Sequence, residues 1–153
     1  MELPRPVRQY DVFISFRGED TRKGIVSHLH RAFRLKGIEK IFKDDKTLEI
    51  GDSISEEIKE AIHNSKFAVV VISKNYVSST WCLEELRMIM ELDKENLLTA
   101  VPVFYNVVPS DVRHQRGTFS LESKKRTMAA KVQKWREALT AVADISGKDL
   151  SKW

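Results

Sequence analysis

Residues 67–72 read Phe67-Ala68-Val69-Val70-Val71-Ile72, six apolar residues in succession. A strand with one face in water alternates apolar and polar residues, whereas a continuous apolar run is typical of a strand covered on both faces. Such strands occur in parallel sheets that have helices packed on each side. This run therefore predicts an α/β fold around a buried central strand.

Three further apolar, β-rich runs lie on either side of this one, at residues 10–16, 38–42 and 99–105. Segments with helical spacing of apolar residues occur at 22–36, after a Ser53–Glu56 capping box, at 81–94 and at 128–143. Alternating strands and helices predict right-handed crossovers and a doubly wound parallel sheet with helices on both faces. A short fifth strand is expected near residues 147–150.

The ends of the first predicted helix carry recognisable signals. Asp20 or Thr21 precedes its apolar stripe and suits the N-cap position, where a side-chain oxygen accepts from a free backbone N–H. Gly37 follows the stripe and suits the left-handed residue that ends many helices. The predicted helix therefore spans 22–36.

Composition limits the classes of protein that this chain can represent. Its 153 residues fit one domain, and Cys82 is the single cysteine, so no internal disulfide forms. No apolar run approaches the roughly 18 residues of a membrane span. The net charge is +4, but the densest basic run, residues 124–126, is short and lacks interleaved aromatics, which argues against nucleic-acid binding. These features favour an intracellular protein without a membrane segment.

The fold class locates the working surface, because ligands of open α/β sheets bind outside the C-terminal ends of the strands. One segment there, residues 16–22, follows a strand and opens a helix, so it could bind a phosphate or be only a capped turn. Residues 44–52 form a long polar loop at the same edge, which is either functional or a solvated connector.

A third segment at this edge, residues 78–86, places Trp81 at the start of a helix with Glu85 four residues later. Residues at this spacing share one side of a helix. A carboxylate beside a flat ring suits a ligand that contains a sugar and a base. Equally, Trp81 could be a core residue and Glu85 an acid that complements the helix dipole.

The order of these motifs resembles plant TIR domains of the disease-resistance type. The matching stretches, read along the chain, are residues 10–22 (YDVFISFRGEDTR), 43–45 (KDD), 81–86 (WCLEEL), 102–105 (PVFY), 109–113 (PSDVR) and 135–139 (WREAL). Each is short, and their shared order and spacing carry the resemblance. It assigns residues 9–153 to a TIR domain and leaves residues 1–8 as a flexible tail.

The resemblance implies a flavodoxin-like sheet of four to five strands and NAD⁺ nucleosidase activity in plant immune signalling. NAD⁺ or NADP⁺ is then a substrate, with no cofactor and no metal required. The implied catalytic residue is Glu85, not Glu84, and its role requires the carboxylate to face a cleft. The residues implied to border the nucleotide are Phe16, Arg17, Gly18, Asp45, Trp81 and Cys82.

The resemblance also implies self-association with like or related TIR domains through Ser27 and His28, and a cytoplasmic location that can extend to the nucleus. Family members continue into a final helix that packs beside this pair, and the chain ends at Trp153, before it. Val108 and Ile50 replace residues that relatives usually have as an acid and an arginine.

Two other functions fit parts of the pattern. A non-enzymatic TIR adaptor would associate in the same way without turnover. A phosphate-accepting response regulator shares the fold class, but it would need an aspartate after residue 72, where Ser73 stands. Cys82 has no histidine near it in the sequence and is better interpreted as helix packing than as a nucleophile.

Overall fold

A computed structural model describes residues 9–18, 21–44 and 54–145. The described residues form a parallel sheet with the strand order β2-β1-β3-β4. The strands are β1 (Tyr10–Ser15), β2 (Ile41–Lys43), β3 (Ser65–Ile72) and β4 (Thr99–Phe104). The four predicted strands and their parallel pairing are confirmed, while the fifth strand expected near 147–150 and the tail at 1–8 lie outside the described residues.

The central strand is β3, as its composition predicts. It pairs with β1 on one side and β4 on the other, so that Val69 lies opposite both Ile14 and Val101. Residues 68–72 have no solvent-exposed surface. Pro102 is accommodated because β4 is an edge strand among the described residues, where a missing N–H donor need not break a ladder.

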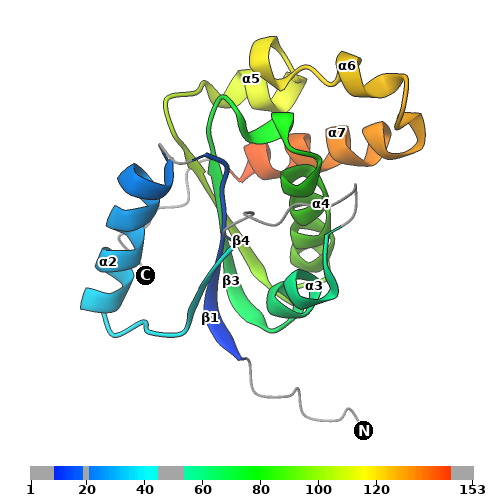
Figure 1. The fold of residues 1–153 in the computed structure, drawn as a ribbon. Helices are drawn as coiled ribbons and strands as arrows, with labels where there is room; N and C mark the ends of the chain where they lie inside the picture. The colour runs from blue at the N-terminus through cyan, green and yellow to red at the C-terminus, as the bar shows by residue number, and fades with distance from the viewer. Residues whose placement is uncertain (1–8, 19–20, 45–53, 146–153) are drawn as a thin grey trace, which may run out of the picture.

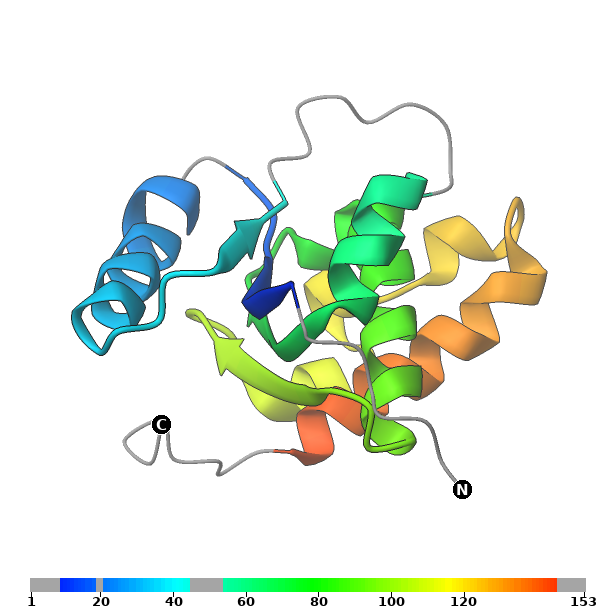
Figure 2. The same cartoon turned by 90° about the horizontal axis from the view of Figure 1, so that it is seen from below.

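Helices cover both faces of this sheet. The helix α2 (Ser27–Leu35) lies on one face, and α3 (Glu56–His63), α4 (Thr80–Lys94) and α7 (Ala129–Asp144) lie on the other, as Figures 1 and 2 show. Two separate apolar clusters correspond to these layers. The smaller joins Phe33 of α2 to Ile14, and the larger joins Trp135 of α7 to Phe13 and Leu86.

The first helical segment is less regular than its sequence suggests. A π-helical stretch, η1 (Arg22–Val26), precedes α2, and Gly24 inside it has the non-helical angles φ −94° and ψ −105°. Thr21 occupies the N-cap position as predicted but forms no side-chain cap, because its hydroxyl is the donor to the carbonyls of Arg17 (2.6 Å) and Gly18 (2.8 Å). The alternative cap, Asp20, lies outside the described residues.

Gly37 does end this helix, with φ +87°. The backbone N–H of Ile38 then donates to the carbonyl of Phe33 at 2.9 Å. This bond holds Ile38 in the helix terminus, so β2 begins at Ile41 and not at the predicted residue 38. The predicted helix end at Gly37 is confirmed. The predicted start of the next strand is wrong by three residues.

The start of α3 also differs from the prediction. Ser55 occupies its N-cap and accepts from the N–H of Ile58 at 3.3 Å. The capping box predicted at Ser53 and Glu56 is therefore wrong, because Glu56 is the first helical residue and not the third.

The segment between β4 and α7 contains short helices. They are α5 (Pro109–His114), η3 (Gly117–Phe119) and α6 (Glu122–Lys125), and Figure 1 shows α5 and α6 at the top of the molecule. Proline at the first position of α5 is a common helix start.

None of the helices described is long and apolar enough to cross a membrane.

Candidate active site

The C-terminal end of β1 places a polar side chain inside the larger apolar cluster. Phe13 belongs to that cluster, and Ser15, two residues later, faces the same side of the sheet because strand side chains alternate. Ser15 has no exposed surface. A buried hydroxyl needs hydrogen-bond partners, and Ser15 finds them on the segments that follow β3.

Those partners are Glu85 on α4 and Tyr76 in η2 (Tyr76–Ser78). The Ser15 hydroxyl donates to Oε1 of Glu85 at 2.7 Å, and the Tyr76 hydroxyl lies 2.7 Å from the Ser15 oxygen. The Ser15 hydroxyl carries one proton, and that proton points to Glu85. Tyr76 must then donate to Ser15, and the three groups form a chain in which each hydroxyl donates towards the carboxylate.

Tyr76 keeps its proton in this environment. Burial raises the pKa of its hydroxyl well above the ordinary value of 10.0, and the neighbouring acidic groups of Cys82, Glu85 and Asp44, in their ionised forms, raise it further. The hydrogen bond with Ser15 acts in the opposite direction and is outweighed. Tyr76 is therefore a neutral donor throughout the physiological pH range, and its single proton is shared between the Ser15 oxygen at 2.7 Å and the Cys82 carbonyl at 3.2 Å.

The first turns of α4 complete the cluster. Ser79 caps the helix by accepting from the N–H of Cys82 at 3.2 Å. Trp81, which is 8% exposed, begins the helical face that Glu85 continues. The Cys82 thiol is buried and donates to the Phe16 carbonyl at 3.6 Å, which links α4 to the end of β1.

The structure thus brings three predicted site residues together on α4: Trp81, Cys82 and Glu85. Phe16 reaches Cys82 through its backbone carbonyl only, and its side chain packs in the smaller apolar cluster on the other face of the sheet. Arg17 and Gly18 lie in the turn immediately after Phe16, where Gly18 has φ +93° and its left-handed backbone favours glycine. Asp45 lies outside the described residues, directly after the buried Asp44.

The remaining predicted residues, Ser27 and His28, are exposed on α2, across the sheet from Glu85. They belong to a surface separate from the cluster around Ser15.

Sequence reasoning missed Ser15 and Tyr76. Ser15 is the first polar residue after the three apolar positions 12–14 of β1, and it stands at the ligand edge, which was a usable signal. Tyr76 lies in the segment after β3, but its distance to Ser15 depends on how η2 turns back over the sheet. Among the described residues, no three His, Cys, Asp or Glu side chains cluster as metal ligands.

Glu85 has no exposed surface. The cleft that its predicted role requires is therefore closed in this arrangement, and its carboxylate faces Ser15 instead of solvent. A ligand can reach Glu85 only if the surrounding side chains or the backbone nearby move.

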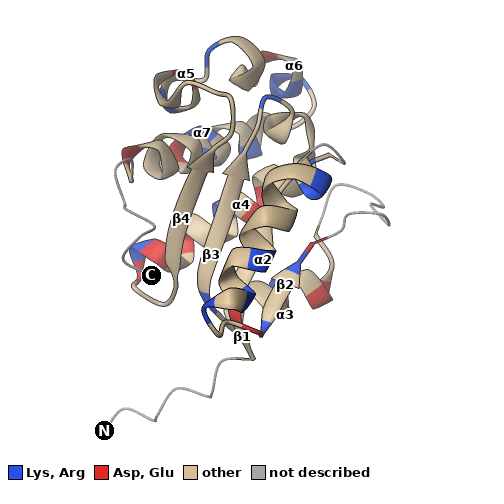
Figure 3. Cartoon of the chain, turned by 90° about the vertical axis from the view of Figure 1, so that its left-hand side faces the viewer, with Lys and Arg blue, Asp and Glu red and all other residues tan. Residues whose placement is uncertain are grey.

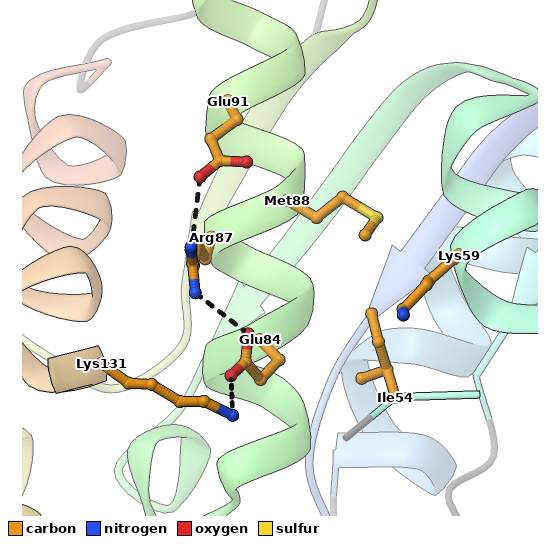
Figure 4. A pocket seen from close by; sticks show the side chains of 7 residues that line it. All are labelled: Ile54, Lys59, Glu84, Arg87, Met88, Glu91 and Lys131. Carbon is orange, nitrogen blue, oxygen red and sulfur yellow. Dashed lines mark hydrogen bonds and ion pairs between the residues drawn. The ribbon is translucent and has the colours of Figure 1, made fainter. Parts of the chain in front are cut away.

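Glu84 has a different environment, although it is adjacent in sequence. Its carboxylate pairs with Lys131 of α7 at 3.0 Å and with Arg87 at 3.8 Å. Figure 4 shows these ion pairs beside a surface pocket of about 270 Å³ that α4 and Lys131 of α7 line on one side. Met88 extends from α4 towards Ile54, which lines the other side of the pocket. Successive helical residues point about 100° apart, so Glu84 serves a surface ion-pair network while Glu85 enters the core.

A parallel sheet with helices on both faces and the strand order β2-β1-β3-β4 defines a flavodoxin-like domain, and Glu85 lies at the sheet edge where ligands of this class bind. The family model described as "TIR domain" matches residues 9–153. The chain therefore belongs to the TIR domain family, and its relatives place it in the plant disease-resistance type.

Two such relatives are similar along nearly the whole chain. TMV resistance protein N of Nicotiana glutinosa is 48% identical over 143 residues, covering 90% of this chain and 12% of that protein. Disease resistance protein RPV1 of Vitis rotundifolia is 44% identical over 147 residues, covering 95% of this chain and 10% of that protein. The chain thus spans about an eighth of these relatives or less.

Solved structures agree with the fold. The TIR domains in the activated Roq1 resistosome, which directly recognises the pathogen effector XopQ, are 53% identical, with a TM-score of 0.78 and coverage of 94% of this chain and 93% of that one. The TIR domain of the Toll-related receptor TRR-2 from Hydra magnipapillata is 23% identical with a TM-score of 0.52, and it covers 84% of this chain and 98% of that one. The second similarity supports the fold alone.

Proposed function

We propose that this chain is an NAD⁺ nucleosidase that acts in plant immune signalling and needs self-association for activity. The observation that carries the proposal is the placement of Glu85. It lies at the C-terminal edge of the sheet, one helical turn from Trp81, and its carboxylate is oriented by the Ser15 hydroxyl at 2.7 Å. Membership of the TIR family adds weight to this reading of the site.

The proposed reaction breaks the glycosidic bond between the nicotinamide ring and the ribose of NAD⁺ or NADP⁺. Nicotinamide leaves as a neutral molecule because its ring nitrogen carries a positive charge before cleavage, so little general-acid assistance is needed. A single carboxylate suffices, unlike the paired carboxylates of ordinary glycosidases. Glu85 would stabilise the positive charge that develops on the ribose, Trp81 would stack on a ring of the nucleotide, and water would capture the sugar.

The burial of Glu85 supports a requirement for assembly. In the single chain described here the carboxylate is covered, so the site must open before NAD⁺ binds. Contacts between neighbouring domains could supply the free energy for that opening. The exposed Ser27 and His28 on α2 are the proposed contact residues, and the homologous Roq1 domains are seen within a resistosome.

The decisive experiment compares Glu85→Gln with Glu84→Gln. The purified chain, at high concentration and also fused to an oligomerisation module, is incubated with NAD⁺, and nicotinamide is quantified by HPLC. Turnover should disappear in Glu85→Gln and persist in Glu84→Gln, with both variants folded by circular dichroism. Wild-type turnover in folded Glu85→Gln would refute the proposed role.

A second candidate is a non-enzymatic TIR adaptor of the cytoplasm. The complete burial of Glu85 is the observation that favours it, because a carboxylate that never reaches substrate contributes only to packing. Absence of NAD⁺ and NADP⁺ cleavage by the wild-type chain, even when it is fused to the oligomerisation module, would select the adaptor over the enzyme.

A further inference from the structure

A second surface, remote from Glu85, concentrates unneutralised positive charge. A groove of about 420 Å³ lies between α2 and β2, and its lining residues are Ser27, His30, Arg31, Arg34, Leu35 and Lys43. No acidic residue occurs within α2. Figure 3 shows the basic residues of α2 and the adjoining end of β2 on the same side of the molecule. We refer to this surface as the α2–β2 groove.

Several cations on the other face of the sheet have acidic partners. Across the sheet, Lys59 pairs with Glu56 at 3.3 Å and Arg87 pairs with Glu91 at 3.3 Å. Within the part of the chain that the structure describes, Arg31, Arg34 and Lys43 form no ion pair. Among the described side chains, no ion pair therefore neutralises these three cations, and a surface of one sign attracts ligands of the opposite sign.

His30 lines the groove, and its pKa responds to the same positive charges. Partial burial lowers the pKa of its imidazole, and the positive charges of Lys43 and Arg34 lower it further. Lys43 comes from β2 and Arg34 from α2, so cations from both walls act on one point. A negatively charged group placed there would be stabilised by the same potential that disfavours protonation of His30.

The shape of the groove favours an extended protein segment. Among the described strands β2 pairs only with β1, so the groove is open along the outer edge of the sheet. Leu35 is 80% exposed and offers an apolar contact beside the cations. No aromatic side chain lines the groove, so bases have nothing on which to stack, and its volume holds a few side chains rather than a duplex.

We propose that the α2–β2 groove docks an extended acidic segment of a partner protein. Its carboxylates would contact Arg31, Arg34 and Lys43, and an apolar side chain would cover Leu35. The proposal does not depend on NAD⁺ cleavage, because Glu85 lies under the opposite face of the sheet. The groove shares Ser27 with the proposed self-association surface and extends from it along Arg34 to Lys43.

The probe is a fluorescein-labelled nonapeptide in which one central leucine is flanked by four glutamates on each side. The neutral control peptide has glutamine at every glutamate position. Fluorescence anisotropy is measured with the wild-type chain, with Arg31→Glu/Arg34→Glu, and with Lys59→Glu/Lys134→Glu as the matched control. The two variants have identical net charge, and the control changes cations that already have acidic partners. Arg31, Arg34 and Lys134 are exposed and Lys59 is partly exposed, and folding is checked by circular dichroism.

The acidic peptide should bind wild type more tightly than the neutral one, and the groove variant should lose roughly tenfold or more in affinity while the control loses little. Peptide binding should also raise the pKa of His30 in an NMR titration. Equal losses in both variants would show a net-charge effect and overturn the proposal. Binding to a DNA duplex and to phosphatidylserine vesicles is measured separately, and tighter binding to either than to the acidic peptide would also overturn the proposal. An unchanged pKa of His30 in the presence of the peptide would overturn it as well.

Discussion

The Ser15 hydroxyl donates a 2.7 Å hydrogen bond to Oε1 of Glu85, although the two residues are 70 positions apart in the sequence. The bond joins the end of β1 to the second turn of α4 and holds one carboxylate oxygen in a fixed direction. Tyr76 stabilises this orientation by donating a hydrogen bond to the Ser15 oxygen. The orientation of the proposed catalytic carboxylate thus depends on residues from two other segments.

Ser15→Ala should lower the rate of NAD⁺ cleavage without weakening substrate binding. A hydrogen bond to a charged group contributes about 1.5–3 kcal/mol, so a loss of about ten- to hundredfold in kcat is expected. KM should change little because Ser15 positions Glu85 and does not contact substrate. Steady-state kinetics by HPLC measures both constants, and a rise in KM at unchanged kcat would contradict the positioning role.

Tyr76 should make the folded chain less stable in alkaline solution. Its pKa is raised by burial, so the unfolded chain releases this proton near pH 10 while the folded chain retains it. The unfolded state then binds fewer protons, and stability is complete below about pH 10 and falls above it. One such group contributes up to about 1.4 kcal/mol per pH unit, until the pH reaches the folded-state pKa.

Urea unfolding between pH 8 and 11.5 tests this effect, with Tyr76→Phe as the comparison. The variant should be less stable than wild type at pH 8, because it lacks the donor to Ser15, and should lose less stability as the pH rises. Parallel curves for the two proteins would show that Tyr76 is not the responsible group.

The order of strands and helices could be predicted because periodicity reports burial directly. The run at residues 67–72 can be buried on both faces only in a helix-covered parallel sheet, and the structure has it there. Helix termini were less predictable. Ser53 and Ser55 are equally good caps by residue type, and the choice of Ser55 depends on how the chain enters α3.

The candidate site was only partly predictable for a similar reason. Trp81 and Glu85 lie on one helix, where spacing in sequence fixes spacing in space. The contacts of Ser15 with Glu85 and Tyr76 span 70 and 61 positions, so they depend on tertiary packing. The burial of Glu85 was also not predictable, since a helical pattern does not show how deeply a helix end is covered.

Glu84→Gln should weaken the packing of α4 against α7 and leave the proposed chemistry intact. The change removes a carboxylate that is 14% exposed and pairs with Lys131 and Arg87. Partly exposed pairs contribute up to about 1 kcal/mol, so a loss of that order is expected. Thermal unfolding in low and high salt measures it, and the difference from wild type should shrink as salt screens the pairs. A larger difference at high salt would exclude an ionic origin.

Cleavage of NAD⁺ should depend on the concentration of the chain. If contacts between domains open the site over Glu85, the rate per molecule rises as more chains associate. The double variant Ser27→Ala/His28→Ala should associate less and cleave more slowly at each concentration, while Glu56→Ala, an exposed change on α3 across the sheet, should behave as wild type. Sedimentation velocity and HPLC turnover are measured on the same dilution series. A rate per molecule that is constant over a hundredfold dilution would show that the single chain opens its own site.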